Sequence, residues 1–94
     1  MRLENKIAIV TGAAKGIGLA VAEVFVKEGA VVFMADIDDY QLKLETDKLN
    51  QDGIMAHPIH CDVGNTEQVE KLISDVISKK GRIDILVNNA AVAI

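Results

Sequence analysis

The chain has 94 residues, half of them hydrophobic, which is enough for one small domain with its own core. Its net charge of −4, without a basic cluster, argues against nucleic acid and anionic membrane surfaces as partners. The single cysteine excludes an internal disulfide and fits a reducing compartment. No signal peptide pattern opens the chain, and no apolar run approaches the roughly 20 residues of a membrane span. We therefore expect one cytoplasmic domain over residues 1–94.

Short apolar runs rich in β-branched residues alternate with segments of helical periodicity. Strands are predicted at residues 6–11, 31–36, 54–61 and 83–88. Helices are predicted at residues 16–28, at residues 40–51, and from residue 65 or 66 to the glycine at 81. This β-α-β-α-β-α-β order predicts an α/β fold, with a doubly wound, mostly parallel sheet covered by helices on both sides.

Three details of these elements can be predicted further. Pro58 cannot donate to a central ladder and places the third strand at a sheet edge. Asn65 and Gln68 have the spacing of a capping box at the start of the third helix. The first helix carries apolar residues at one helical face, which predicts the side that packs on the sheet: Ile17, Ala20, Val21, Val24 and Phe25.

The fourth predicted strand has no helix after it in this sequence. Residues 90–94 read AAVAI and follow it directly. One face of this strand would therefore be partly bare beside an open sheet edge, which is a liability for a monomer. Either the chain is a fragment, or a second copy or another chain covers this edge.

A glycine-rich turn, TGAAKGIG at residues 11–18, joins the first strand to the first helix. Gly12 permits a tight turn, Gly16 lets the backbone approach a pyrophosphate, and Gly18 lets the helix pack close to the strand. The free amides and positive end of the helix then face the anion. The spacing is G-x-x-x-G-x-G and lacks the Gly-Lys-Ser/Thr ending of a P-loop, and the alternative is a purely structural turn.

Asp36 ends the second strand, 18 positions after Gly18. A carboxylate there can accept hydrogen bonds from both hydroxyls of an adenosine ribose and repels a 2′-phosphate, which favours NAD over NADP. Lys15 works in the opposite direction, because a cation in the glycine loop could approach a 2′-phosphate. The alternative for Asp36 is a helix N-cap or an ordinary loop acid.

Polar residues also follow the third and fourth strands. Asp62 and Val63 come after the third, and Asn88 and Asn89 come after the fourth. Both pairs lie at the carboxyl ends of strands, the edge where open α/β sheets bind ligands.

Together, T-G-x-x-x-G-I-G at 11–18, the acid at 36, D-V at 62–63 and N-N-A at 88–90 resemble the classical short-chain dehydrogenase/reductase family over the whole chain. The resemblance implies a Rossmann fold and an oxidoreductase that transfers hydride between a nicotinamide cofactor and an alcohol or carbonyl substrate. It also implies cofactor contacts from each strand end: Gly12, Ala14, Lys15, Gly16, Ile17 and Gly18 at the pyrophosphate, Asp36 and Ile37 at the adenosine ribose and adenine, Asp62 and Val63 at the adenine, and Asn89 and Ala90 at the second ribose.

Two departures from the family pattern stand out. The family reacts through a Ser and a Tyr-x-x-x-Lys, helped by a further Asn, all downstream of N-N-A-G, and the chain ends before them. The only tyrosine, Tyr40, has Leu44 where that motif needs lysine, so we expect a surface residue and assign no catalytic residue. Ala91 stands where the family usually has glycine, and its Cβ would crowd the cofactor or require a backbone shift.

No metal site is expected. The aspartates at 36, 38 and 39 suit a solvated, capping turn better than a cation site. Along a strand only His57 and Cys61 share a face while His60 points to the other, and two ligands do not make a closed metal shell. Cys61 is predicted to be a small buried hydrophobe.

Three hypotheses follow. The first is the amino-terminal, NAD-binding portion of a short-chain dehydrogenase/reductase, able to bind the adenosine part of the cofactor but inactive by itself. The second is a stand-alone small nucleotide-binding or interaction module whose fourth strand pairs with a second copy or a partner chain. The third is a folding fragment that binds nothing.

Overall fold

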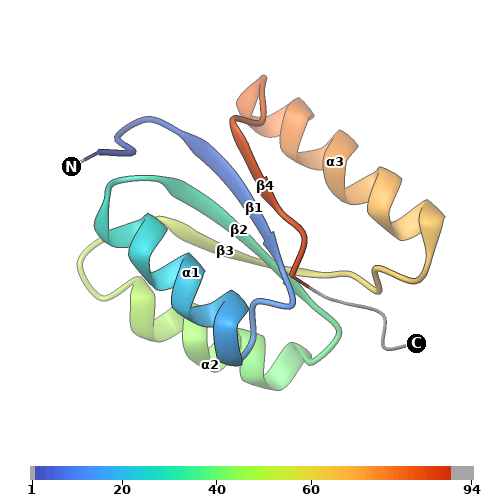
Figure 1. The fold of residues 1–94 in the computed structure, drawn as a ribbon, viewed down its shortest axis with the longest axis horizontal. Helices are drawn as coiled ribbons and strands as arrows, with labels where there is room; N and C mark the ends of the chain where they lie inside the picture. Colours follow the sequence, from blue (N-terminus) through green and yellow to red (C-terminus); the bar gives the residue numbers. More distant parts are fainter. Residues whose placement is uncertain (1, 90–94) are drawn as a thin grey trace.

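The computed structural model describes residues 2–89 (Figure 1). Strands and helices alternate in the predicted order: β1 (Ile7–Thr11), α1 (Gly16–Lys27), β2 (Val31–Asp36), α2 (Asp39–Leu49), β3 (Ala56–His60), α3 (Thr66–Lys80) and β4 (Ile85–Val87). The third and fourth strands are shorter than the apolar runs that predicted them. No helix in the described range is both long enough and apolar enough to cross a membrane.

The four strands form one parallel sheet in the order β3-β2-β1-β4. The chain therefore builds outward from β1 to β3 on one side and then crosses to β4 on the other. Across the sheet, Thr11 is level with Ala35, and Asp36 is level with His60. This register brings the carboxyl ends of the strands to one edge, with the change of direction between β1 and β4. The predicted doubly wound α/β fold is confirmed.

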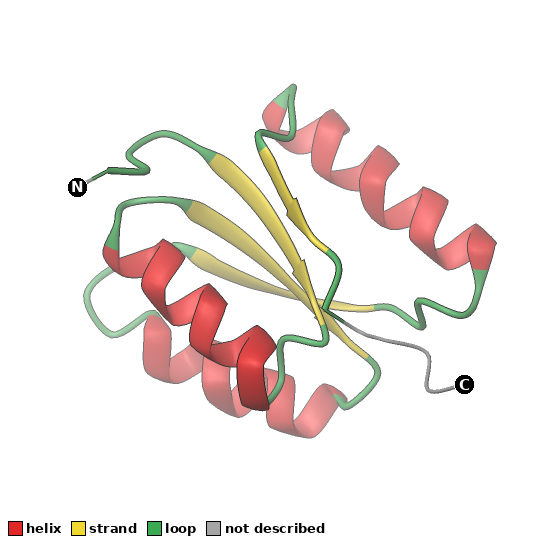
Figure 2. Cartoon of the chain, in the orientation of Figure 1, coloured by secondary structure: helices red, strands yellow, loops and turns green. Residues whose placement is uncertain are grey.

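Helices cover both faces of this sheet (Figure 2). α1 and α2 lie on one face and α3 lies on the other. Successive residues of β1 serve opposite sides, since Ala8 and Val10 pack under α1 and α2 while Ile7 and Ile9 pack under α3. Strands that are buried on both faces are the ones that read as continuous apolar runs.

The two edges of the sheet differ in character. At β3, Pro58 is exposed on the outermost strand, which confirms the predicted edge position. At β4, the edge is apolar: Leu86 is 56% exposed, and Ile77 on the neighbouring α3 is 47% exposed. The prediction of a partly bare fourth strand therefore agrees with the described structure.

The predicted packing face of α1 is correct only in part, because Val21 and Phe25 pack against the core but Ile17, Ala20 and Val24 are exposed. Gly18 and Ala22 are buried against the sheet, whereas Ile17 is 74% and Val24 is 56% exposed. The reason is the closeness of the helix to the loop beneath it, because a Cβ at position 18 would lie 2.1 Å from the Gly12 carbonyl oxygen. Only the smallest residues fit there, so Gly18 and Ala22 make the closest approach, and Val21 and Phe25 pack against the core beside them.

The predicted caps at the helix ends are present, except for one half of the capping box of α3. Asp38 and Asn65 are the N-caps of α2 and α3, and each accepts a hydrogen bond from the amide three residues on. The reciprocal half of the capping box is absent in this described region, because Gln68 Oε1 instead accepts from the Asp62 amide at 2.8 Å. Gly81 ends α3 in the left-handed conformation, at φ 80°.

Candidate functional site

Four loops meet at the carboxyl edge of the sheet. They follow β1, β2, β3 and β4, and they begin at residues 12, 37, 61 and 88 respectively. The parallel order and register place all four at the same edge, beside the amino end of α1. This edge is where open α/β sheets bind ligands.

The loop after β1 is shaped to hold an anion. Gly12 and Gly16 have φ of 61° and 62°, a conformation that L side chains rarely adopt. A Cβ at Gly16 would meet nothing within 4 Å, so the backbone there faces open space. Lys15, at the N-cap of α1, makes no capping hydrogen bond with its side chain, and the first turn of this described helix holds no acid. The first amides of α1 therefore remain available to a negatively charged group.

Asp36 joins this loop to the end of β2. Its Oδ2 accepts from the Ala14 amide at 3.0 Å, and its Oδ1 accepts from the Asp38 amide at 3.0 Å. The N-cap of α2 is Asp38 rather than Asp36, which removes the capping alternative for Asp36. A carboxylate offers about four lone-pair sites, so both oxygens keep the capacity to accept from a ligand hydroxyl.

A small cavity of about 100 Å³ opens beside Asp36. Its lining brings together five predicted site residues from three strand ends, Gly12, Asp36, Ile37, Asp62 and Val63, and adds Cys61. Asp62 is fixed from both sides, since its amide donates to Gln68 and its Oδ1 accepts from the Gly64 amide at 2.9 Å. Burial, and secondarily the charge of Asp62, raises the pKa of the Cys61 thiol, so the thiol stays protonated at neutral pH.

The ends of β1 and β4 are tied together by side chains. The Asn89 amide donates to Thr11 Oγ1 at 3.0 Å, and Thr11 Oγ1 donates to Asn88 Oδ1 at 3.1 Å. Asn89 Nδ2 also reaches the Gly12 carbonyl oxygen at 3.4 Å. Asn89 thus lies against the glycine loop, while the predicted residue Ala90 and the substituted Ala91 lie outside the described residues. The sequence interpretation assigned no such role to Thr11 or Gln68, although both stand at an element terminus.

Comparison with known proteins identifies the family. The family model described as short chain dehydrogenase matches residues 6–94. The chain belongs to the short-chain dehydrogenase family. Over 91 residues it is 45% identical to the uncharacterized oxidoreductase YxbG of Bacillus subtilis (strain 168). The aligned residues make up 97% of this chain and 33% of that protein.

Two further relatives agree. Galactitol 2-dehydrogenase of Agrobacterium fabrum is 45% identical over 92 residues, which is 98% of this chain and 35% of that protein. The crystal structure of a short chain dehydrogenase from Mycobacterium smegmatis superposes with a TM-score of 0.89 at 38% identity, covering 99% of this chain and 40% of that one. The chain therefore spans about a third of the length of the curated relatives it matches.

Within the described part of the chain, the other reactive residues do not form a second site. Tyr40 is 76% exposed on α2, as predicted. His57 stacks on Phe33 with ring centroids 5.0 Å apart, on the α3 side with Cys61, whereas His60 turns to the α2 side and its Nδ1 lies 2.7 Å from Asp39 Oδ1. Among residues 2–89, no group of three or more His, Cys, Asp or Glu side chains could hold a metal ion.

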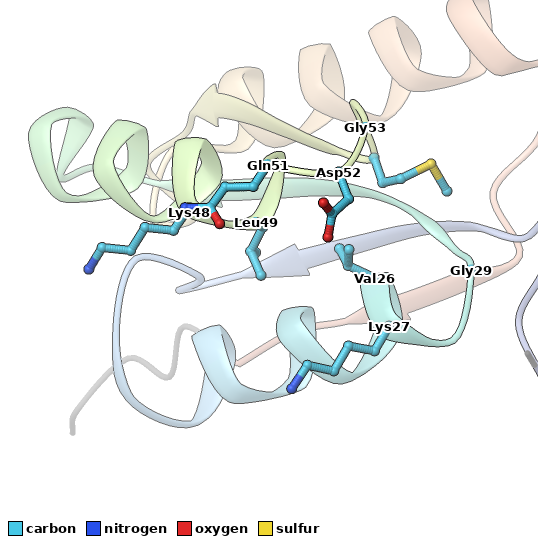
Figure 3. A pocket seen from close by; sticks show the side chains of 9 residues that line it. Val26, Lys27, Gly29, Lys48, Leu49, Gln51, Asp52 and Gly53 are labelled. Carbon is cyan, nitrogen blue, oxygen red and sulfur yellow. The ribbon is translucent and has the colours of Figure 1, made fainter.

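A larger cavity, of about 550 Å³, lies at the opposite edge of the sheet (Figure 3). It opens between the carboxyl-terminal ends of α1 and α2, with Val26 and Leu49 in its wall and the carboxylate of Asp52 pointing toward Val26. None of the residues predicted to bind a cofactor lines it. Size alone therefore does not mark the site, because the smaller cavity at the strand ends is the one that adjoins the glycine loop.

Proposed function

We propose that this chain is the dinucleotide-binding portion of an NAD-dependent short-chain dehydrogenase, whose whole protein transfers hydride between the nicotinamide and an alcohol or carbonyl substrate. The observation that carries the proposal is the contact between the Asp36 carboxylate and the glycine-rich loop at Ala14. This contact places the anion-binding loop directly beside the carboxylate that would accept from the ribose, at one edge of the sheet. The nicotinamide ring supplies the hydride chemistry when it is bound.

The loop and the start of α1 bind the pyrophosphate. Gly12, Ala14, Lys15, Gly16, Ile17 and Gly18 surround the two phosphates, and the amides at the start of α1 face them with the positive end of the helix. The Ala14 amide itself donates to Asp36 and so shapes the loop. The open space beside Gly16 admits the phosphates, since a Cβ there would point into it. Gly18 keeps α1 close to the end of β1 and so fixes the position of those amides.

The adenosine occupies the neighbouring edge. Asp36 accepts from the ribose hydroxyls through its remaining lone pairs and repels a 2′-phosphate, which favours NAD. Ile37, which is 63% exposed, packs with Val63 against the adenine, and Asp62 contacts its polar edge. Asn89 contacts the second ribose, a role that the family resemblance also implies for Ala90.

Catalysis needs residues that this sequence does not contain. The acid/base pair of the family is a Tyr-x-x-x-Lys, and Tyr40 lacks that spacing because Leu44 stands where the motif needs lysine. We therefore expect this chain to bind the cofactor without turning over an alcohol or carbonyl substrate.

Calorimetric titration of the purified chain with NAD and with NADP tests the proposal. We expect NAD to bind more tightly than NADP, and Asp36→Ala to abolish that preference. Equal affinity for both cofactors, combined with loss of NADP binding in Lys15→Ala, would transfer the selectivity to Lys15. Absence of binding by either cofactor would refute the proposal and favour a fragment that binds nothing. NADH-linked turnover by the purified chain would refute its inactivity.

The apolar edge at β4 favours a second candidate, an interaction module. Leu86 on β4 and Ile77 on α3 expose apolar surface beside an open strand edge. Such an edge can pair with a second copy or with a partner chain. Sedimentation at increasing concentration tests the second copy, because a concentration-independent monomer would contradict self-association through β4.

A further inference from the structure

We propose that Asp36 is also a positioning residue, which latches the glycine-rich loop in its anion-binding shape before any dinucleotide arrives. This role is separate from ribose recognition, although its effect on affinity rests on the proposed function. It predicts that Asp36 contributes to the binding of ligands whose ribose it cannot touch.

Two consecutive amides of the loop are hydrogen-bonded to the end of β2. The Ala13 amide donates to the Ala35 carbonyl oxygen at 3.1 Å, and the Ala14 amide donates to Asp36 Oδ2 at 3.0 Å. Ala13 and Ala14 are both fully buried. The first bond is part of the backbone, whereas the second depends entirely on one side chain, so a substitution at position 36 can remove it.

The carboxylate is itself held in place. Its Oδ1 accepts from the Asp38 amide, and the backbone oxygen of Asp36 accepts from the Cys61 amide at 3.1 Å. The end of β2 is thus fixed to the loop after β3 and to the start of α2. A carboxylate oriented this firmly can orient the loop in turn, because a hydrogen bond to a charged acceptor is stronger than one between neutral groups.

Loss of the carboxylate leaves the buried Ala14 amide without its acceptor. An unpaired buried donor is costly, so the loop should leave this shape more often. Ala14 lies between Gly12 and Gly16, whose backbone can adopt many conformations once released. The amides at the start of α1 would then face the phosphates for a smaller fraction of the time, and the apparent affinity would fall by that fraction.

Amide hydrogen exchange of the free chain tests the latch without any ligand. In Asp36→Ala we expect the Ala14 amide to exchange at least about tenfold faster, while the Ala13 amide, bonded to backbone, serves as an internal reference. Asp38→Ala is the matched control, because Asp38 also accepts one backbone hydrogen bond but touches α2 and not the loop. Unchanged Ala14 exchange in Asp36→Ala would overturn the proposal.

Binding of ADP and of 2′,3′-dideoxy-ADP separates the two roles of Asp36. The dideoxy compound keeps the diphosphate but has no ribose hydroxyls for Asp36 to bind. We expect Asp36→Ala to weaken dideoxy-ADP binding by about fivefold or more, the factor of one hydrogen bond. Removing a negative charge near the phosphates would strengthen binding, so electrostatics cannot cause such a loss. Unchanged or tighter dideoxy-ADP binding would overturn the proposal.

Two further outcomes remain informative. If Asp36→Ala does not fold, Asp36→Asn provides the same comparison, because a neutral amide oxygen is a weaker acceptor than a carboxylate oxygen. Exchange at Ala14 should still accelerate, and unchanged exchange there would overturn the proposal. If the unsubstituted chain binds neither ADP nor its dideoxy form, the proposed function fails, and the exchange rate at Ala14 still decides whether the latch exists.

Discussion

Replacing Gly18 with alanine should destabilise the fold through a backbone clash. The new Cβ would lie 2.1 Å from the Gly12 carbonyl oxygen and 2.8 Å from its carbon. Since nonbonded heavy atoms settle about 3.5 Å apart, α1 and the loop must separate by roughly 1.4 Å. Overpacking of this kind costs about 1–3 kcal/mol, and we expect the upper end because backbone atoms cannot rotate away. The higher helix propensity of alanine returns about 1 kcal/mol, which leaves a net loss of about 2 kcal/mol.

Urea unfolding followed by circular dichroism measures this loss. With a slope of about 1 kcal/mol per molar urea for a chain of this size, the midpoint should fall by about 2 M. Gly64→Ala is the matched control, since its Cβ would lie 3.3 Å from Asp62 Oδ1, a side-chain atom that can move, and its midpoint should shift by less than about 0.5 M. A Gly18→Ala midpoint within that same margin of the unsubstituted chain would refute the close approach of α1 to the loop.

Three other predictions concern stability. Asn65→Ala removes the N-cap of α3 and should lower the free energy of unfolding by about 1 kcal/mol in urea melts, and an unchanged midpoint would contradict the capping role. The Ile7 amide and then Arg82 hold the pKa of Asp84 below its ordinary 3.8, so this carboxylate stabilises the fold above about pH 4 and the gain is lost as the pH falls through the lowered pKa. Asp84→Asn should therefore be less stable at pH 7, with a difference that shrinks on acidification, and a gap that persists to pH 2 would argue against this linkage. Val24→Thr, on the exposed flank of α1, should shift the free energy of unfolding by less than about 0.5 kcal/mol, whereas Ala22→Val should lower it by about 1–3 kcal/mol. Thermal melts that reverse this order would contradict the orientation of the helix.

Periodicity and turn chemistry were sufficient to predict the order of the elements. Strands buried on both faces appear in the sequence as unbroken apolar runs. Each helix ends near a glycine, the residue that most easily adopts the left-handed conformation found after helix ends. Pro58 placed β3 at an edge because its missing N–H cannot serve a second neighbour. The exact strand ends could not be predicted, since apolar residues such as Ile54 and Ile83 continue past the ladder.

The orientation of α1 could not be predicted from hydrophobicity alone. The apolar stripe through Ile17 and Val24 has perfect helical spacing, yet both residues are exposed. The deciding factor is distance, because Gly18 and Ala22 are the residues that let the helix approach the loop and the sheet. Small residues at the same spacing as the apolar stripe were the available signal, and a hydrophobic scale gives them little weight.

In the candidate site too, the sequence predicted which residues lie near one another but not which of them are hydrogen-bonded. Strand-end logic correctly brought Asp36, Asp62 and Asn89 to one edge of the sheet. The hydrogen bond from the Ala14 amide to Asp36 joins residues 22 positions apart, and it depends on loop coordinates that no spacing rule supplies. Gln68 illustrates the same limit, since its side chain reaches the Asp62 amide in place of the N-cap amide of its own helix.

The most direct test of the account is amide chemical-shift mapping of the isotope-labelled chain during titration with NAD. We expect shifts only in the strand-end loops, at residues 12–18, 36–37, 62–63 and 88–89, with the Ala14 amide among those affected. The cavity between the ends of α1 and α2 in Figure 3 should remain unaffected. Shifts that cluster at Val26, Leu49 and Asp52, or the absence of any shift at saturating NAD, would contradict dinucleotide binding at the carboxyl edge of this sheet.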